Sequence, residues 1–248
     1  MTLSRRQMLG HSLGAAMLPS LSRIAFADDA YPSRPLRLIV GFTPGSASDV
    51  VGRFFAKGAS TALGQQVVVE NKPGAGSAIA AKYAAAAEPD GYTLFLIAAS
   101  TLTNQVVNAR LGLDLLKQFT PVARLASGPY VLVVNPNAGA NSVGELVAMA
   151  KSQPGKVLYG SVGSGSLPDL CSELFAQRAG AKLTHVPYQG SPQVINDLIA
   201  GRITMAFENA IAVAGQIKAG KIKALATTTA KRASTLPDVP TLAEAGMK

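Results

Sequence analysis

Short apolar runs alternate along the chain with segments in which apolar residues recur every three or four positions. Near the start, the run Leu38–Val40 is followed by a break at Pro44-Gly45 and then by apolar residues at helical spacing, namely Val50, Val51, Phe54 and Phe55. This pattern predicts a strand, a tight turn and a helix.

The turn of this first unit carries polar groups. Ser46 or Ser48 can cap the helix, and Asp49 lies in its first turn, where a negative charge suits the helix dipole. Unpaired backbone N–H groups and hydroxyls are thereby placed at the carboxyl end of a strand, which is where open α/β sheets bind small ligands. An ordinary βα corner explains these residues equally well.

The same alternation continues to the end of the chain. Further strands are predicted at Gln66–Glu70, Tyr92–Ala98, Tyr130–Asn135, Val157–Tyr159, Lys182–Val186, Ile203–Glu208 and Ile222–Ala226, with a weaker one at Phe119–Ala126. Helices are predicted at Ala78–Ala87, Leu146–Ser152, Pro168–Ala179, Gln193–Ala200 and Ile211–Ala219. Strands alternating with helices through short loops predict an α/β fold with mainly parallel sheets. The connectors Ala123–Ser127 and Thr227–Ala230 are candidate crossings between two lobes.

Composition and charge narrow the class of partner. Of the 248 residues, 48% are hydrophobic and only 15% are charged, which excludes a disordered chain. The formal net charge is +9, but the basic residues are scattered without interleaved aromatic residues. We therefore expect no nucleic-acid binding, and a positive surface would instead attract anionic ligands.

Residues 1–27 have the composition of an export signal. Arg5 and Arg6 precede a weakly apolar stretch, Met8–Leu21, which is too short to span a membrane, and Ala25-Phe26-Ala27 is an A-x-A cleavage site. Cleavage after Ala27 and a periplasmic location are expected. The adjacent arginines resemble a twin-arginine signal, and the ordinary secretory route stays open as well.

Residues suited to catalysis or metal binding are scarce. After the leader the chain has one histidine, His185, one cysteine, Cys171, and no cluster of carboxylates, so no metal site and no cofactor are expected. His185 lies within a predicted strand, where a packed or surface histidine is more common than a catalytic base. Cys171 is expected to be a small core residue of a helix. An enzyme is therefore not predicted.

Polar loops recur at the ends of predicted strands. They supply hydroxyls, amides and backbone N–H groups, and they occupy Thr43–Asp49, Ser100–Asn104, Ser161–Ser166, Tyr188–Ser191 and Glu208-Asn209. Such groups hold a small carboxylate by hydrogen bonds without breaking bonds. Each loop alone could be an ordinary turn, but their recurrence favours binding.

Eight sequence segments resemble, in order, the Bug/TctC family of periplasmic solute receptors, which are associated with tripartite tricarboxylate transporters. They are Tyr31–Pro35, Phe42–Asp49, Val67–Gly76, Pro89–Thr93, Tyr159–Ser166, His185–Gly190, Ala219–Ala226 and Leu236–Gly246. The resemblance covers nearly all of residues 31–248. It implies a periplasmic-binding-protein fold with two α/β lobes and a ligand cleft between them.

The resemblance also implies domain boundaries and a ligand site. Residues 28–124 and 228–248 would form the first lobe and residues 125–227 the second. The implied ligand-binding residues are Phe42, Thr43, Pro44, Gly45, Ser46, Ser48, Asp49, Ser100, Thr101, Asn104, Ser161, Gly163, Gly165, Ser166, Asp169, Tyr188, Glu208 and Asn209. The implied ligands are small carboxylates or amino-acid-like metabolites.

Three departures from the family pattern concern the ligand. Ser46 and Ala47 stand where glycines are usual, Asp169 stands where a histidine is usual, and Glu208 replaces an aspartate. Asp49, Asp169 and Glu208 together would suit an amine-bearing ligand if all three faced the cleft.

The chain stops soon after the last matching segment, where family members continue. We therefore expect an incomplete first lobe and poor stability. The function implied is capture of a small solute for a tripartite tricarboxylate-type transporter by a monomer whose partners are membrane transporter subunits. An extracytoplasmic sensor that presents its ligand to a signalling protein, or a non-functional fragment of such a receptor, remain the alternatives.

Overall fold

The structure, a computed structural model, describes residues 31–247. Residues Arg34–Lys248 form one compact unit, and of the preceding unit, Met1–Ser33, only residues 31–33 are described. The expected leader and its cleavage site thus lie outside the described residues. No helix in the described part of the chain is long and apolar enough to cross a membrane.

The first half of the unit is built on a three-stranded parallel sheet with the strand order β2-β1-β3. The elements are β1 (Leu36–Val40), α2 (Ala47–Leu63), β2 (Val67–Asn71), the 3₁₀ helix η1 (Ala75–Ser77), α3 (Ala78–Ala85), β3 (Thr93–Leu96), α4 (Ala99–Val107), η2 (Ala109–Leu111) and α5 (Leu115–Gln118).

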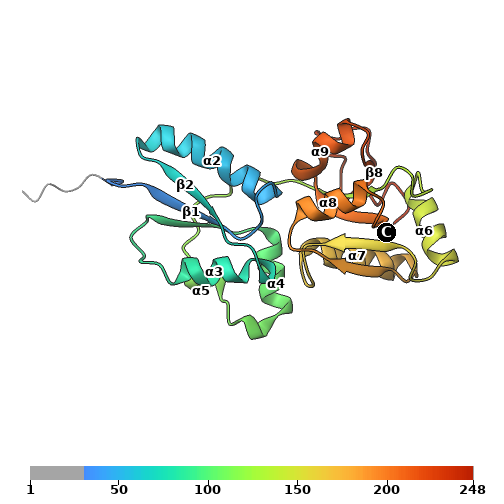
Figure 1. The fold of residues 1–248 in the computed structure, drawn as a ribbon, viewed down its shortest axis with the longest axis horizontal. Coiled ribbons are helices and arrows are strands. Elements are labelled where there is room, and N and C mark those ends of the chain that lie inside the picture. Colours follow the sequence, from blue (N-terminus) through green and yellow to red (C-terminus); the bar gives the residue numbers. More distant parts are fainter. Residues whose placement is uncertain (1–30, 248) are drawn as a thin grey trace, which may run out of the picture. The chain divides into compact units, whose positions relative to one another are not determined.

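The central strand β1 is buried on both faces. Leu38 and Val40 pack towards Ala56 of α2, whereas the intervening Ile39 packs towards Ala80 of α3. Because successive side chains of a strand point to opposite faces, α2 and α3 cover opposite sides of the sheet (Figure 1). This arrangement explains why Leu38–Val40 of β1 is a continuous apolar run rather than an alternating one.

The second half is built on a five-stranded sheet with the order β6-β5-β7-β4-β8. The elements are β4 (Tyr130–Val134), α6 (Val143–Ser152), β5 (Leu158–Ser161), α7 (Leu167–Ala179), β6 (Thr184–Pro187), α8 (Ser191–Ile199), β7 (Met205–Asn209), α9 (Ala210–Lys218) and β8 (Lys223–Thr227). Strands β6, β5 and β7 are parallel, and β4 runs antiparallel to both β7 and β8.

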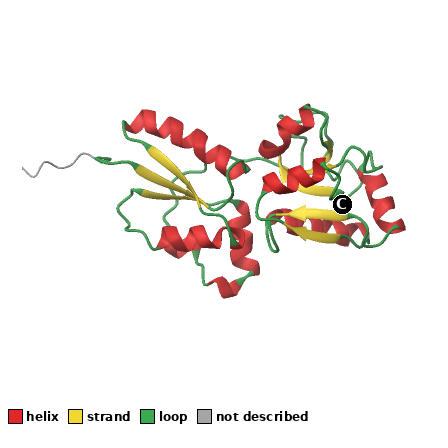
Figure 2. Ribbon diagram, in the orientation of Figure 1, coloured by secondary structure: helices red, strands yellow, loops and turns green. Residues whose placement is uncertain are grey.

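Helices cover both faces of this sheet too (Figures 1 and 2). Leu132 of β4 belongs to a core shared with α6 and α7, whereas its neighbour Val131 belongs to a core shared with α8 and α9. The predicted α/β fold with mainly parallel sheets is confirmed, and the predicted strands and helices occur within a few residues of their expected bounds, with one exception.

The exception is Phe119–Ala126, which forms no strand and runs as a largely exposed connector between α5 and β4. Pro121 lies within the segment and Pro129 follows it, and proline cannot donate to a strand ladder. Its apolar residues Val122 and Leu125 are 86% and 40% exposed, so no sheet face holds them.

The segment after β8 contacts the second sheet. Thr227 bridges to Thr241, and the apolar side chains of Leu242, Ala245 and Met247 pack against the core that α6 and α7 share with the sheet. Residues 228–248 were expected in the first lobe, and the contacts described for Thr241, Leu242, Ala245 and Met247 are with the second sheet and its core. Thr241 and Glu244 form the reciprocal hydrogen bonds of a capping box, but these bonds stabilise a turn and no helix follows within the described residues.

This packing predicts that Thr241→Ala lowers the free energy of unfolding by about 1 kcal/mol, because it removes a buried hydroxyl that accepts from the Glu244 backbone N–H. Thr61→Ala is the matched control, since Thr61 is an exposed helix residue. Urea unfolding of both variants measures the difference. Equal effects would contradict a structural role for the segment at this sheet.

Candidate functional site

Loops from both sheets meet at the carboxyl ends of their strands. The Ser100 hydroxyl of α4 accepts a hydrogen bond from the backbone N–H of Leu167 in α7, at 3.2 Å. Thr103 of α4 donates to the carbonyl oxygen of Gly165, also at 3.2 Å. The Tyr130 hydroxyl at the start of β4 is hydrogen-bonded to Ser100, and its burial raises its pKa to about 12. The first turn of α4 therefore joins the loop before α7.

The loop after β1 contacts the turn before α8. A Cβ atom at Gly190 would lie only 2.0 Å from the Thr43 hydroxyl oxygen, and one at Gly45 would lie 3.5 Å from Pro192. Gly190 has an extended backbone that any residue can adopt, with φ −172°. Glycine is therefore required at position 190 by the close approach of Thr43 and not by backbone conformation.

Asp49 organises the loop that precedes α2. Its buried carboxylate accepts hydrogen bonds from the Gly45 backbone N–H at 3.0 Å, from Arg53 at 3.0 Å and from the Asn71 side chain at 2.8 Å. Burial raises its pKa, but these three donors outweigh burial and hold the pKa below the ordinary value. Ser46 caps α2 by accepting from the Asp49 backbone N–H. These two residues are fully engaged in shaping the loop.

Asn104 has a comparable role in the first half. Its side-chain amide donates to the Ala75 carbonyl at 2.7 Å and to the Gly76 carbonyl at 3.3 Å, which fixes the turn before α3. That turn ends at Ser77, which has a left-handed backbone, with φ +76°, and is 1% exposed. The Ser77 side chain lies where a Cβ of Gly41 would be, so the turn is pressed against the end of β1.

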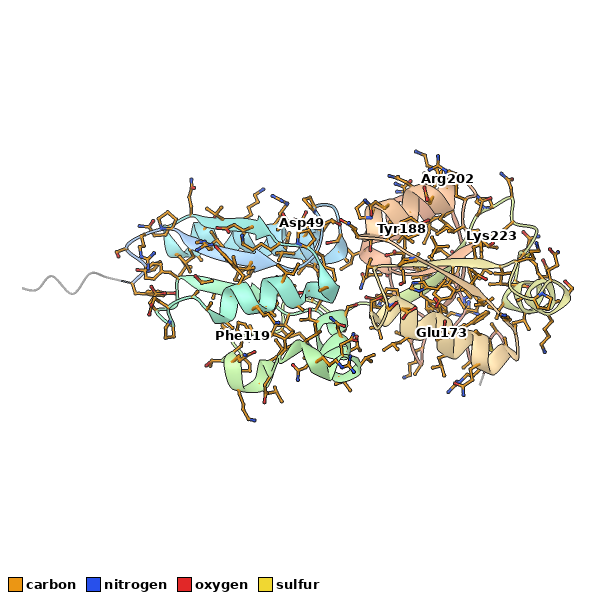
Figure 3. The ribbon with its side chains drawn as sticks, turned by 60° about the horizontal axis from the view of Figure 1, so that its bottom comes forward. Asp49, Phe119, Glu173, Tyr188, Arg202 and Lys223 are labelled. Carbon is orange, nitrogen blue, oxygen red and sulfur yellow. The ribbon has the colours of Figure 1, made fainter. Side chains whose placement is uncertain are left out.

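A buried polar cluster lies beneath the loop after β5. The Tyr159 hydroxyl is hydrogen-bonded to Asp169 at 2.9 Å and also to Glu173, a residue of α7 that is labelled in Figure 3. Asp169 also accepts from the Gly165 backbone N–H at 2.8 Å. Burial, followed by these two carboxylates, raises the pKa of Tyr159 well above its usual range. Asp169 is thus tied to its own loop and to the core.

His185 belongs to the same cluster. Its ring stacks on Tyr159 with the centroids 4.8 Å apart, and its Nε2 atom lies 2.7 Å from the Ser161 hydroxyl. The same Nε2 atom is the one nearest Asp169, at 3.6 Å. A catalytic histidine uses one ring nitrogen for the nucleophile and the other for the carboxylate. This geometry differs from that of a catalytic triad, and the ring is packed against Tyr159.

Tyr188 points its hydroxyl away from the strand ends. It donates to Asp197 at 2.8 Å, and Asp197 also accepts from Arg202 at 2.7 Å; Figure 3 shows Tyr188 and Arg202 in the same region. Burial and the Asp197 carboxylate raise the pKa of Tyr188 to about 12. This side chain contributes to an open groove of about 630 Å³ beside α8 rather than to the meeting loops.

Glu208, at the end of β7, is 1% exposed. Its Oε2 atom accepts from the Ser191 hydroxyl at 2.8 Å, whereas its Oε1 atom has no hydrogen-bond partner. Burial outweighs the Ser191 hydroxyl and the Asn209 backbone N–H and raises the pKa of the carboxyl to about 8. The adjacent Asn209 caps α9 by accepting from the Ile211 backbone N–H. Of the three acids considered for an amine ligand, Glu208 alone keeps an unpaired oxygen.

Four buried side-chain oxygens of the described residues have no hydrogen-bond partner, and all four lie at strand ends. They belong to Thr43, Ser77, Ser166 and Glu208. A buried polar atom without a partner costs about 1–3 kcal/mol, so this concentration is unusual for a purely structural region. Hydroxyls and a carboxyl in this state have unused capacity for hydrogen bonds.

Some of the remaining predicted ligand-binding residues are buried and hydrogen-bonded within the protein, and others are at least partly exposed. Phe42 packs into the core above β1 and accepts from Asn71 through its carbonyl oxygen. Thr101 is buried and accepts from the Ala98 backbone N–H at the start of α4. Pro44 is exposed, Ser48 is half-buried, and Gly163 donates its N–H to Ser161.

Three residues of this region were not among the predicted ligand-binding residues. Ser191 lies in one of the predicted polar loops and Ser77 directly before a predicted helix, but nothing in the local pattern distinguished them from other turn serines. Tyr130 was read only as the start of a strand. Its contact with Ser100 depends on how two distant segments pack, which a one-dimensional pattern does not contain.

No group of three or more His, Cys, Asp or Glu side chains that could hold a metal ion occurs in residues 31–247. Cys171 is half-buried against the core of the second sheet, and its burial raises its pKa to about 11, which suits the predicted core role. The interactions that the described loops can make with a ligand are hydrogen bonds and van der Waals contacts.

The sequence matches one protein family over most of its length. Residues 51–248 match the sequence model of the tripartite tricarboxylate transporter family receptor, TctC. Protein BugT of Bordetella pertussis is 37% identical over 220 residues, which are 88% of this chain and 68% of BugT.

Two solved structures are similar in fold and sequence. An R. palustris protein solved with adipate has 37% identity and a TM-score of 0.85, with 88% of this chain and 73% of that chain covered. MatC from Rhodopseudomonas palustris with bound malate has 28% identity and a TM-score of 0.83, with 88% of this chain and 74% of that chain covered. The chain thus spans about three quarters of the length of these proteins.

The role of Asp49 predicts that Asp49→Asn lowers the free energy of unfolding by about 1–3 kcal/mol at neutral pH, because a buried acceptor of three hydrogen bonds loses its charge. The lowered pKa means that this stabilisation is present at neutral pH and is lost as the pH falls, so the two proteins converge in acid. Asp238→Asn, at an exposed position, is the control in urea unfolding. An equal loss in both variants would refute the role.

The raised pKa of Glu208 predicts the opposite pH dependence. A pKa raised from 4.5 to about 8 on folding means that wild-type stability is undiminished below pH 4.5 and falls as the pH rises through about 8. The stability of Glu208→Gln relative to wild type should therefore increase by roughly 3–5 kcal/mol over this range. Urea unfolding at several pH values measures it, with the exposed Glu88→Gln as control. Parallel profiles for wild type and Glu208→Gln would contradict the assignment.

Proposed function

The chain belongs to the tripartite tricarboxylate transporter receptor family, and on this basis we propose that it captures a small carboxylate at the carboxyl ends of its strands. Receptors of this family are periplasmic binding proteins, and the leader expected at residues 1–27 would export the chain and be removed after Ala27. The protein would then deliver the bound solute to the subunits of a tripartite transporter in the membrane.

The unpartnered oxygens at the strand ends carry the proposal. Thr43, Ser77 and Ser166 offer hydroxyls that donate to no described group, and an ionised carboxylate is the ligand whose oxygens accept most strongly. The similar proteins solved with adipate and malate support a carboxylate as the ligand class. The excess of basic over acidic residues would also concentrate anions near the protein.

The hydrogen bonds of the candidate catalytic side chains support binding of a ligand rather than its chemical conversion. His185 is occupied by Ser161 and Tyr159, and Asp49 and Asp169 are held by their own loops. The ligand would therefore leave the site unchanged. A receptor of this kind needs only to bind its ligand, close around it and release it.

Removal of one free hydroxyl tests the proposal. Thr43→Val preserves the shape of the side chain and breaks no described hydrogen bond, so stability should be unchanged or slightly raised. Its affinity for adipate or malate should nevertheless fall about tenfold or more, because a hydrogen bond to a charged ligand contributes about 1.5–3 kcal/mol. Calorimetric titration of the mature chain measures the affinity, with adipamide as an uncharged comparison ligand.

The control is Thr103→Val, whose hydroxyl is already used by the Ser100 and Gly165 carbonyls. That variant should lose about 1 kcal/mol of stability. Failure of the wild-type protein to bind any of several short mono- and dicarboxylates would overturn the proposed ligand class. Uptake of the bound solute by cells with and without the gene separates transport from sensing.

A further inference from the structure

Glu208 is the acidic side chain that the folded protein leaves incompletely bonded. Its two carboxyl oxygens are not equivalent, since Oε2 accepts from the Ser191 hydroxyl at 2.8 Å and Oε1 has no partner. The whole side chain is 1% exposed, so water does not solvate the free oxygen. An ionised carboxylate in this position would leave buried charge on an oxygen without a donor.

The surroundings of Glu208 provide no counter-charge. Ser191 at the start of α8 is an uncharged donor, and the Asn209 backbone N–H on β7 is the other polar group that lowers the pKa of the carboxyl. Tyr130 on the neighbouring strand β4 is the titratable group that interacts with it, and Cys171 of α7 acts on Tyr130 in turn. In the described part of the chain no Lys, Arg or His is paired with Glu208.

A second unpartnered oxygen lies on the other side of the same turn. Ser191 donates to Glu208, while its neighbour Gly190 is in contact with Thr43, whose hydroxyl oxygen is also buried and unpaired. The Gly190-Ser191 turn thus has one free oxygen from β7 on one side and one from the loop after β1 on the other. Both oxygens are buried, so a ligand could reach them only if the loop at 42–46 separated from this turn.

Resting on the function proposed above, we propose that Glu208 binds the ligand as an uncharged carboxylic acid whose Oε1–H donates a hydrogen bond to a carboxylate oxygen of the ligand. Oε2 stays the acceptor of the Ser191 hydroxyl, so each carboxyl oxygen has one task. Thr43 supplies a second donor from across the turn. An acid that keeps its proton makes this corner selective for anions, whereas an ionised acid would select an ammonium group.

The raised pKa of Glu208 agrees with this assignment, because burial favours the protonated form and the carboxyl would lose its proton only near pH 8. Deprotonation would replace a donor with a negative charge facing the ligand carboxylate. Affinity for an anion should therefore fall by up to tenfold for each pH unit above this value. Adipate and malate stay fully ionised across that range, so the ligand itself adds no titration.

Calorimetric titration of adipate and malate from about pH 6.5 to 9.5, with aspartate as the amine-bearing probe, tests the inference. Wild type should bind the two dicarboxylates progressively more weakly above about pH 8. Glu208→Gln should keep binding near pH 7, because its amide N–H₂ can donate in place of Oε1–H, and its affinity should be independent of pH. Glu208→Leu should bind at least tenfold more weakly than Glu208→Gln, and the exposed Glu88→Gln should behave as wild type.

The possible failures are distinguishable. Absence of binding of every probe at every pH would count against the proposed function itself. Binding by wild type that is independent of pH, or that declines equally in Glu208→Gln, would overturn the role of Glu208 and leave the function standing. Affinity that rises with pH and is lost in Glu208→Gln would show an ionised Glu208 that binds an ammonium group.

A ligand-free readout completes the test. The infrared spectrum of the wild-type protein at pH 7 should contain the carbonyl band of a protonated, buried carboxyl that Glu208→Gln removes and Glu88→Gln does not. Absence of this band would overturn the inference whichever ligands bind.

Discussion

Burial of polar groups at the carboxyl ends of the strands is the constraint on which the rest of the site depends. Parallel strands leave their terminal backbone groups and the first turns of the following helices at one edge of each sheet. The chain satisfies most of these groups internally, through Asp49 and Asn71 in one half and through Tyr159, Asp169 and Ser161 in the other. The few buried oxygens left without partners are therefore the candidates for hydrogen bonds to a ligand.

The residues that hold the loops in their conformations therefore differ from the residues whose polar atoms remain unpaired. Asp49 and Asp169 are charged, yet each is hydrogen-bonded within its own loop, and Asn104 is hydrogen-bonded to the turn before α3. The weaker groups, such as the Thr43 and Ser166 hydroxyls, remain free. A receptor that must release its ligand gains from this arrangement, because neutral donors hold an anion less tightly than a buried ion pair would.

Much of the fold was predictable from the sequence. Apolar runs such as Leu38–Val40 and capping signals such as Ser46 specify local structure directly, and the helix α2 begins where they indicate. The failed prediction, a strand at Phe119–Ala126, had an apolar pattern but no partner strand. Pairing is decided by the tertiary structure, and a local pattern cannot report it.

The sequence indicated polar segments near strand ends but not the contacts of their side chains. It could not show that Ser100–Asn104, expected to be a loop, belongs to helix α4, that the Tyr188 hydroxyl pairs with Asp197, or that Glu208 keeps one oxygen free. These contacts depend on how separate elements pack against one another, which the local sequence pattern does not contain. Likewise, Gly190 reads as an ordinary turn glycine until Thr43 is seen against it.

The most direct test of a carboxylate site at the strand ends is hydrogen–deuterium exchange with and without malate. The account predicts slower exchange of backbone amides in residues 42–46, 161–166 and 190–191 when malate is present, with little change at β8 or in α6. Protection confined to the open groove lined by Gln193, Asn196 and Arg202, or spread evenly over the chain, would contradict it.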